Sequence, residues 1–182
     1  MKLKLFLISI SALLALVGYK TYSEAKTAIP GWKKFTDKQV GYSIQYPEKW
    51  TIEKTCVGGY ANDTYSCIKS PELGLSPIPD VIKGQLITIG PKGSSYFPSS
   101  GVPSDFCNED PMSKIKSCTD LIVGGRRAIK KTFENYPFID VAILKQEQIE
   151  FVIRLQYPSN LLMSSQSFET FDQILSTFHF LD

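Results

Sequence analysis

The fold is decided by the stretch Val40-Gly41-Tyr42-Ser43-Ile44-Gln45-Tyr46-Pro47-Glu48-Lys49-Trp50. Its first apolar residues fall at every second position, and small or polar residues lie between them. Because side chains alternate faces along a strand, this spacing predicts a β-strand with one apolar and one solvent-facing side. Pro47 lacks the N–H that strand pairing requires, so we expect it to end the strand at the second position of a tight turn. Trp50 and Ile52 then begin a second apolar strand, and we interpret the aromatic residues as core rather than as a ligand box.

Length and charge define the class of protein. The chain has 182 residues, of which 43% are apolar and 21% are charged, as in one globular domain with a sizeable core. The first 25 residues hold three of the 20 basic and one of the 18 acidic residues, so the remaining chain has no net charge. Nucleic-acid binding depends on an excess of basic residues that displaces counterions, and we therefore predict no nucleic-acid partner.

The chain opens with a basic and then apolar segment. Lys2 and Lys4 precede a run of mostly apolar residues, 5–19, which is the pattern of an export signal. Ser23-Glu24-Ala25 offers the small residues that a signal peptidase requires. The competing interpretation is an uncleaved membrane anchor, although a helix of that length spans only about 22 Å of a hydrocarbon core about 30 Å thick. Both interpretations predict an extracytoplasmic protein, either secreted or anchored to the cytoplasmic membrane by residues 5–19.

The rest of the chain divides into a linker and one domain. Residues 1–25 are assigned to the signal peptide or anchor, and residues 26–38, which contain Pro30 and Gly31, are predicted to be a linker. Periodic apolar patterns begin after them, so residues 39–182 are predicted to form the domain.

Four cysteines follow the export segment. They are Cys56, Cys67, Cys107 and Cys118, and exported chains meet oxidising conditions, so two disulfides are expected. Of the three pairings, we favour the local one, Cys56–Cys67 with Cys107–Cys118, in which each bond closes a short loop. A metal site is disfavoured, because the sequence has no Cys-x-x-Cys pair and no histidine nearby.

Residues 91–104 form a long segment rich in Gly, Ser and Pro. This composition predicts a surface loop, and loops of this length are often functional. Tyr96 and Phe97 lie inside it. Exposed aromatic side chains on a loop could contact a protein partner, or they could fold back onto the sheet. We leave both interpretations open and treat the two residues as candidate partner contacts.

Two hairpins are predicted in the second half of the chain. Gly124-Gly125 follows an apolar run and is typical of a hairpin turn. The basic residues 126, 127, 130 and 131 come next, and because neighbouring strand residues face opposite ways, they favour a solvated strand over one anion site. The second hairpin has a polar tip at 145–148. Its alternating apolar residues are predicted to share one face of each arm. They are Ile139, Val141 and Ile143 on the first arm and Ile149, Phe151, Ile153, Leu155 and Tyr157 on the second.

The last predicted element changes from a period of two to a period of three and four. Its apolar positions are typical of an amphipathic helix, with Ser165 or Ser167 as the cap. Such a helix must cover a sheet, so the sequence predicts an α+β fold in which helices cover an antiparallel β-sheet. The apolar positions are Phe168, Phe171, Ile174, Leu175 and Phe178.

Catalytic parts are scarce. His179 is the one histidine, and no Gly-x-Ser-x-Gly elbow, phosphate loop or His-Glu-x-x-His motif accompanies it. The acidic cluster formed by residues 105, 108, 109 and 110 lacks the spacing of a calcium loop and is interpreted as solvated. We therefore predict no catalytic residue, cofactor or metal ligand. A scattered carboxylate pair is the kind of site that a sequence alone does not reveal.

Two motifs at the ends of the predicted domain resemble those of PsbP-like domains. The opening Gly41-Tyr42-Ser43-Ile44-Gln45-Tyr46-Pro47-Glu48-Lys49-Trp50 resembles their Gly-aromatic-x-Ile-x-Tyr-Pro-x-x-Trp start. The closing Phe171-Asp172-Gln173-Ile174-Leu175-Ser176-Thr177-Phe178-His179-Phe180 is similar to their final helix and strand. The resemblance implies a PsbP-like α/β/α sandwich and a non-enzymatic accessory or scaffold role. The export segment and the paired cysteines depart from the photosynthetic pattern, so no photosynthetic function is carried over.

The sequence thus predicts an exported cell-envelope protein with a non-catalytic binding or scaffold domain. Its partner would be another envelope protein, and it would meet the membrane only through the N-terminal segment. The alternatives from other classes are an extracytoplasmic hydrolase with a scattered site and a carrier of a small ligand or cation. A cleft holding coupled carboxylates would favour the hydrolase, and binding of calcium or zinc would favour the carrier.

Overall fold

A computed structural model describes residues 28–54, 65–73, 84–91, 103–108, 114–134, 136–158 and 165–181. The chain divides into a first unit, residues 1–32, and a second unit, residues 33–182. Within the described part of the first unit, the amide of Trp32 donates to the carbonyl of Ile29 at 3.1 Å. The second unit contains the sheets and helices discussed below.

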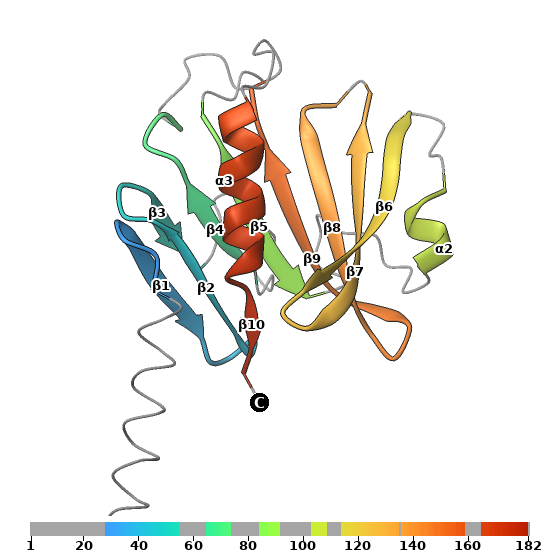
Figure 1. Cartoon of the computed structure of the whole chain (residues 1–182), viewed down its shortest axis with the longest axis horizontal. Coiled ribbons are helices and arrows are strands. Elements are labelled where there is room, and N and C mark those ends of the chain that lie inside the picture. Colours follow the sequence, from blue (N-terminus) through green and yellow to red (C-terminus); the bar gives the residue numbers. More distant parts are fainter. Residues whose placement is uncertain are drawn as a thin grey trace, which may run out of the picture. The chain divides into compact units, whose positions relative to one another are not determined.

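The larger sheet has seven antiparallel strands in the order β3-β4-β5-β9-β8-β7-β6 (Figure 1). Its centre is made by the β8–β9 hairpin, and β3 and β6 lie at its two edges. The two hairpins predicted in the second half of the chain are both present. The strands are β3 (Thr51–Glu53), β4 (Ser66–Lys69), β5 (Leu86–Pro91), β6 (Ile115–Val123), β7 (Arg126–Phe133), β8 (Phe138–Lys145) and β9 (Gln148–Gln156).

The smaller sheet joins residues that are far apart in the chain. It has the order β1-β2-β10, with β1 (Trp32–Asp37), β2 (Tyr42–Pro47) and β10 (His179–Phe180). The register places Phe180 opposite Tyr42, and the amide of Leu181 donates to the carbonyl of Gly41 at 2.8 Å. β1 begins inside the stretch that the sequence indicated as a linker.

One prediction about the opening stretch is wrong, and the turn has an unexpected role. β2 and β3, on either side of the turn, belong to different sheets. The amide of Trp50 donates to the carbonyl of Pro47 at 2.9 Å, which makes Pro47 the first residue of the turn rather than the second. A proline at the first position still ends the strand, because only its carbonyl is needed there. The chain therefore leaves one sheet at this turn and enters the other.

The expected solvent-facing side of β2 is also absent. Ser43 and Gln45 are only 3% and 8% exposed, like the apolar residues between them. β2 is the central strand of its sheet, and the hydroxyl of Thr177 accepts the backbone N–H of Gln45 at 2.8 Å. The polar side chains of β2 are therefore covered along with its apolar ones. Burial also raises the pKa of the Tyr42 hydroxyl above its ordinary value.

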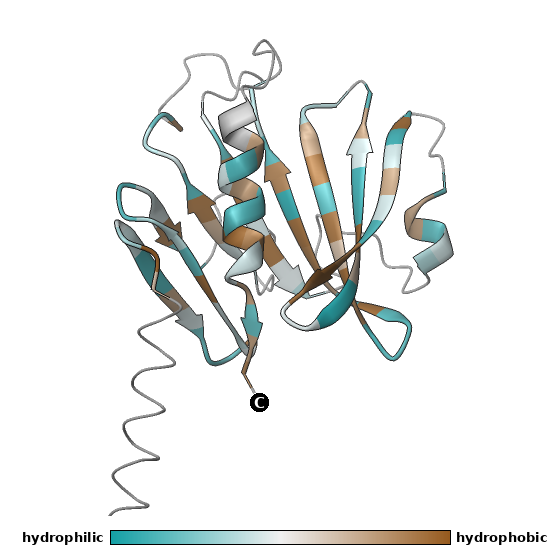
Figure 2. Cartoon of the chain, in the orientation of Figure 1, coloured by the Kyte–Doolittle hydropathy of each residue, from teal (hydrophilic) through white to brown (hydrophobic). Residues whose placement is uncertain are grey.

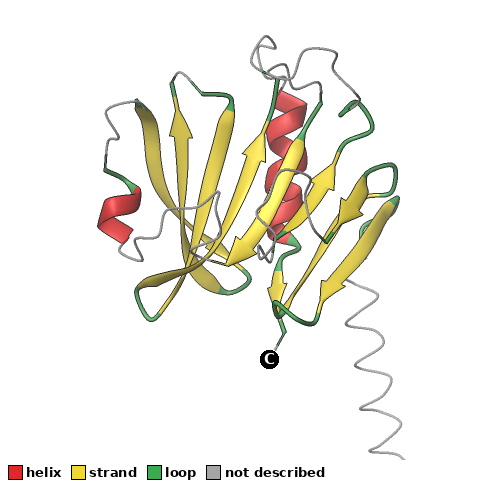
Figure 3. Ribbon diagram, turned by 180° about the vertical axis from the view of Figure 1, so that it is seen from behind, coloured by secondary structure: helices red, strands yellow, loops and turns green. Residues whose placement is uncertain are grey.

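The predicted C-terminal helix is present as α3 (Ser165–Ser176). Figures 1 and 3 show it lying along one face of the seven-stranded sheet. Phe171, Ile174 and Leu175 are buried on its inner side, and Lys130 of β7 reaches across to Asp172 at 2.6 Å. Within the described ranges, no helix combines the length and the apolar character needed to span a bilayer.

A second, one-turn helix lies on the opposite face. α2 (Pro103–Phe106) inserts Phe106 into a buried apolar cluster, and the ammonium of Lys131 lies 4.3 Å from the centre of the Phe106 ring. Lys130 points to α3 and Lys131 points to α2. Because adjacent strand residues point to opposite faces, α2 and α3 lie on opposite faces of the sheet. The other residues of the α2 cluster are Ile129, Ala142, Leu144, Ile149 and Val152.

One member of that cluster corrects the sequence prediction. Ile149 was expected to share a face with Phe151, but the register shifts between Ile143 and Leu144, so that Leu144 lies opposite Ile149. The shift leaves Glu150 as the extra residue of a β-bulge, and a bulge reverses the alternation beyond it. Figure 2 shows hydrophobic and hydrophilic residues alternating along the central strands, although both faces of this hairpin are largely buried.

Candidate functional site

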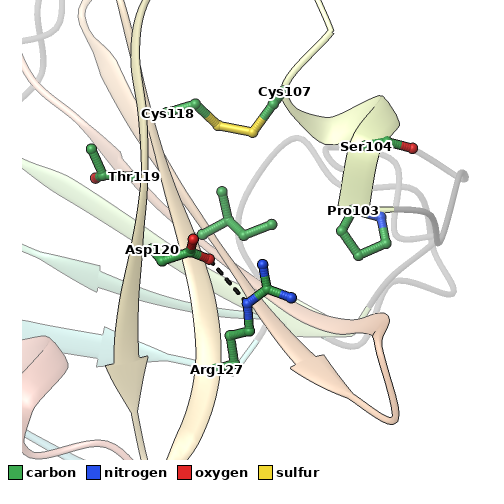
Figure 4. Close-up of a pocket in the computed structure, with 8 residues that line it drawn as sticks. Pro103, Ser104, Cys107, Cys118, Thr119, Asp120 and Arg127 are labelled. Atoms are coloured by element: carbon green, nitrogen blue, oxygen red, sulfur yellow. Dashed lines mark hydrogen bonds and ion pairs between the residues drawn. A yellow bond between two sulfur atoms is a disulfide. The ribbon is translucent and has the colours of Figure 1, made fainter.

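The candidate site is a pocket between α2 and the β6–β7 hairpin. Its volume is about 250 Å³. Figure 4 shows how α2 forms one side of the pocket and how the side chains of the two strands form the other. The lining residues are Pro103, Ser104, Cys107, Cys118, Thr119, Asp120, Arg127 and Ile129.

A disulfide forms one end of the pocket. Cys107, just after α2, is joined to Cys118 of β6, and their Cα atoms are 6.1 Å apart. The structure therefore contains one of the two bonds of the local pairing. Cys67 is buried on β4 and is also disulfide-bonded, whereas Cys56 lies outside the described residues. The Cys107–Cys118 bond links the end of this single helical turn to β6 at the edge of the sheet.

The polar end of the pocket is centred on Arg127. Its Nε donates to Asp120 Oδ1 at 3.0 Å, and a terminal nitrogen donates to Glu147 Oε2 at 2.7 Å. Figure 4 shows the guanidinium pointing into the pocket beside the Asp120 carboxylate. These contacts raise the pKa of Arg127 above its ordinary value, and the hydrogen bond to Asp120 contributes most. All three side chains are exposed, so the group is a fixed polar rim rather than a buried charge.

The other basic residues of β7 also contact carboxylates or rings. Arg126 pairs with Glu150, and its guanidinium lies over the Phe180 ring at 3.4 Å from the centroid. Lys130 pairs with Asp172, as described above. The cations of β7 point to different faces of the sheet, and each is compensated separately.

A second pocket lies at the tip of the β8–β9 hairpin. Its volume is about 360 Å³, and Pro91, the last residue of β5, is part of its wall. Pro103 and Ser104 line the first pocket. The two ends of the predicted 91–104 loop therefore each border a pocket. The remaining lining residues of the second pocket are Lys145, Gln146, Gln148, Ile149 and Glu150.

Several residues singled out from the sequence fall outside this region. Tyr96 and Phe97 lie outside the described residues, as do Glu109 and Asp110 of the acidic cluster. His179 is exposed on β10, opposite Ser43. In the part of the chain that the structure describes, no three His, Cys, Asp or Glu side chains gather as metal ligands would. Ser104 contacts the carboxylate of Asp105 at 3.4 Å, a weak contact between exposed groups.

The Asp120–Arg127–Glu147 group was missed by sequence reasoning. The Gly124-Gly125 turn could have indicated that Asp120 and Arg127 lie close together, because it fixes the register of the hairpin. No sequence signal places Glu147, which comes from the tip of a different hairpin.

Of the comparisons with known proteins, the comparison with solved structures found a match. No protein-family model and no curated protein sequence matches the chain. Among solved structures, the chain is similar to the solution structure of cyanobacterial PsbP from Synechocystis sp. PCC 6803. The match covers 84% of this chain and 94% of that one, with a TM-score of 0.50 and 12% sequence identity. This chain therefore has the PsbP-like fold that its opening and closing motifs indicated.

Proposed function

We propose that this protein is an exported, non-catalytic binding or accessory module of the cell envelope. The observation that carries the proposal is the placement of the two pockets. Each lies at one end of the 91–104 loop, one beside Pro91 and the other beside Pro103 and Ser104. A partner that contacts the loop would therefore also meet two concave surfaces with polar rims, as protein-binding surfaces often provide.

The polar groups of the first pocket favour binding over catalysis. Arg127 is already held between two carboxylates, which gives it a fixed orientation. A general base or nucleophile needs a partner that activates it, and the exposed contact between Ser104 and Asp105 is too long to provide one. The similarity to cyanobacterial PsbP supports the same proposal by analogy of fold alone, because function is decided by the site and not by the fold.

Export is supported by two independent features. The Cys107–Cys118 bond is of a kind that persists in oxidising compartments, and the N-terminal pattern is that of an export signal or anchor. The proposed partner is another envelope protein, with membrane contact through residues 5–19. The neutral charge of the chain beyond residue 25 argues against a nucleic acid.

We also propose how the two helices are layered on the sheet. α3 covers one face of the sheet and α2 contacts the other, and this supports an α/β/α sandwich in which the 91–104 loop leads into the second helical layer. The loop would then connect the sheet to the layer that borders the first pocket.

The test is affinity capture with the exported protein from extracts of its own cell envelope. Tyr96→Ala/Phe97→Ala and Arg127→Ala are compared with the wild type, and Leu181→Ala, at an exposed apolar residue remote from the loop in sequence, is the matched control. We expect the first two variants to lose the same captured protein and the control to retain it. If all three variants capture that protein equally, the loop and the pocket are not its binding surface.

The carrier alternative is tested separately by calorimetry. Titration of the wild type with calcium and with zinc would detect a cation carrier directly. Heat of binding with 1:1 stoichiometry at micromolar affinity would contradict the proposed accessory role in favour of cation transport, and its absence together with loss of capture by the loop variant would support it.

A further inference from the structure

The first strands of the domain carry lysines that have no partner. In the seven-stranded sheet, Lys69 and Lys130 each pair with a carboxylate. Lys33, Lys34 and Lys49, by contrast, are exposed, and within the described part of the chain none of them makes a hydrogen bond or an ion pair. Their charges are therefore available to a partner outside the molecule.

The three lysines lie at one end of the smaller sheet. The amide of Gly41 donates to the carbonyl of Asp37 at 2.9 Å in the short turn between β1 and β2, so these neighbouring strands run antiparallel. The start of β1, which carries Lys33 and Lys34, therefore lies beside the end of β2. Lys49 belongs to the turn that follows β2. Figures 1 and 3 show the start of β1 beside this turn.

The same end of the sheet has little negative charge. Glu48 is exposed next to Lys49. Asp37 is buried at the far end of β1, where it accepts two backbone N–H groups of the turn. Glu53 is already paired with Lys69. Among the described residues at this end, three lysines thus stand against one unpaired carboxylate, which leaves a local excess of positive charge.

The two tryptophans of the chain adjoin these lysines in the sequence. The two stretches are Trp32-Lys33-Lys34 and Lys49-Trp50. Trp50 is half-buried, and its amide is held by the carbonyl of the proline that begins the turn. Tryptophan and lysine both favour the boundary between a bilayer and water, because each combines an apolar body with a polar or charged tip.

A bilayer fits this arrangement better than a small anion does. Lys33 and Lys34 point to opposite faces of β1, so they cannot enclose one small ion. A bilayer is an extended surface, and long side chains at the end of a strand can reach it from both faces. Residues 20–31 separate the predicted anchor from β1, and a segment of that length spans at most about 40 Å. In the anchored form, the start of β1 stays within that distance of the bilayer.

We propose that the end of the smaller sheet formed by Lys33, Lys34, Lys49 and Trp50 lies on a bilayer surface that contains anionic phospholipids. The lysines neutralise lipid phosphates, and the Trp50 indole enters the headgroup region. The inference rests on the envelope location in the proposed function, but it does not depend on the protein partner, whose proposed binding surface involves other residues.

The experiment reconstitutes the full chain in vesicles of phosphatidylcholine, with and without phosphatidylglycerol, and measures the quenching of Trp50 by brominated lipids. Trp32→Phe leaves Trp50 as the only tryptophan and is the background for every variant. The apolar N-terminal segment is expected to insert into both kinds of vesicle. A difference between the vesicles therefore reports the attraction of the domain to negative charge.

Two triple variants with the same change in net charge separate this end of the sheet from the rest of the molecule. In anionic vesicles, we expect the test variant to lose the quenching of Trp50 and the control to retain it. Each lysine near an anionic surface contributes about fivefold to binding, so the test variant should shift the equilibrium toward the free domain by about tenfold or more. Added salt should act in the same direction. The test variant is Lys33→Glu/Lys34→Glu/Lys49→Glu, and the control, at exposed lysines of the β1–β2 turn and of the β6 region, is Lys38→Glu/Lys114→Glu/Lys116→Glu.

Hydrogen exchange of the wild type gives a second measurement that needs no substitution. The amides of the turn that contains Lys49 should exchange more slowly in anionic than in neutral vesicles. Near-ultraviolet circular dichroism verifies that each variant is folded. Equal quenching in the two kinds of vesicle, equal losses in the test and control variants, or an unprotected turn would each overturn the proposal. Because the vesicles contain no other protein, such a result leaves the capture experiment and the proposed function standing.

Discussion

The β6–β7 and β8–β9 hairpins contain the same structural features, but these features are more deeply buried in one hairpin than in the other. Each has a two-residue turn with positive φ, a β-bulge and an aspartate–arginine pair. In the central hairpin, Asp140 and Arg154 lie directly opposite each other and form two hydrogen bonds, 2.6 and 2.9 Å long, with side chains only 3% and 20% exposed. In the edge hairpin, the side chains of Asp120 and Arg127 are 67% and 48% exposed. Depth, more than the kind of contact, should therefore set what each pair contributes to stability.

The two hairpins also differ in the residues at their turn positions. The edge hairpin uses glycine at both turn positions, whereas the central hairpin has Gln146 and Glu147 at φ 51° and 59°. Residues with a side chain reach this conformation at a cost of about 1 kcal/mol or more each. The central hairpin tolerates that cost because its two strands are buried on both faces. The edge hairpin has less burial, and its turn is unstrained.

The largest predicted difference concerns the two aspartates. Asp140→Ala leaves the Arg154 guanidinium largely buried without its carboxylate, and we expect a loss of about 3 kcal/mol in the free energy of unfolding. Asp120→Ala removes an exposed pair and should cost less than about 1 kcal/mol. Denaturation by urea measures both variants. Equal losses would show that burial does not separate the two hairpins.

The disulfide is expected to matter next. Cys107 and Cys118 are 11 residues apart, and opening a loop of that size should lower the stability by about 3 kcal/mol in the chain-entropy model, with less if the unfolded chain is compact. The measurement is urea denaturation of Cys107→Ser/Cys118→Ser. Hydrogen exchange should locate the change at α2 and β6 while β8 and β9 stay protected. Uniform loss of protection would mean that the edge hairpin is not a separate unit of stability.

The two turn glycines provide a matched comparison. A Cβ on Gly124 would lie 3.1 Å from the Phe178 carbonyl oxygen and 3.2 Å from carbons of the Phe178 and Phe180 rings, whereas a Cβ on Gly125 would meet no atom within 4 Å. Gly125→Ala should therefore cost about 1 kcal/mol from its positive φ alone. Gly124→Ala adds crowding and should cost about 2 kcal/mol. Thermal unfolding measures the pair, and equal shifts would rule out the contact with Phe178.

The smallest predicted effect is a gain. Gln146→Asn places a residue that accepts positive φ at the first turn position of the central hairpin, and we expect an increase in stability of about 0.5 kcal/mol. The control is Glu147→Asn, which relieves the same conformation but removes the contact with Arg127, so its gain should be smaller. A loss of stability in Gln146→Asn would mean that the glutamine side chain makes a stabilising contact at the tip.

Sequence patterns predicted what depends on local periodicity. The spacing of Phe171, Ile174 and Leu175 indicated α3, and Gly124-Gly125 indicated the edge hairpin; both are confirmed. The local Cys107–Cys118 pairing is present as well. These features depend on residues within a few turns of one another, where the geometry of a helix or hairpin sets the contact.

Features that depend on the tertiary arrangement were not predicted. The transfer of the chain between sheets at Pro47 and the burial of Ser43 and Gln45 follow from β10, a strand far away in the sequence. The bulge at Glu150 shifted Ile149 to the other face, and no pattern of alternation announces a bulge. Beside the pocket, Glu147 contacts Arg127, and the two residues come from different hairpins.

The pairing of β2 with β10 has a consequence for synthesis on the ribosome. The hydroxyl that accepts the N–H of Gln45 belongs to Thr177, 132 positions later, and β10 follows directly after it. During translation, β10, which pairs with β2, is therefore synthesised more than a hundred residues after it. Closing such a distant contact is slow compared with making a helix or a hairpin. The three-stranded sheet of the nascent polypeptide thus stays incomplete until β10 has been synthesised, whereas the seven strands of the larger sheet precede it in the chain.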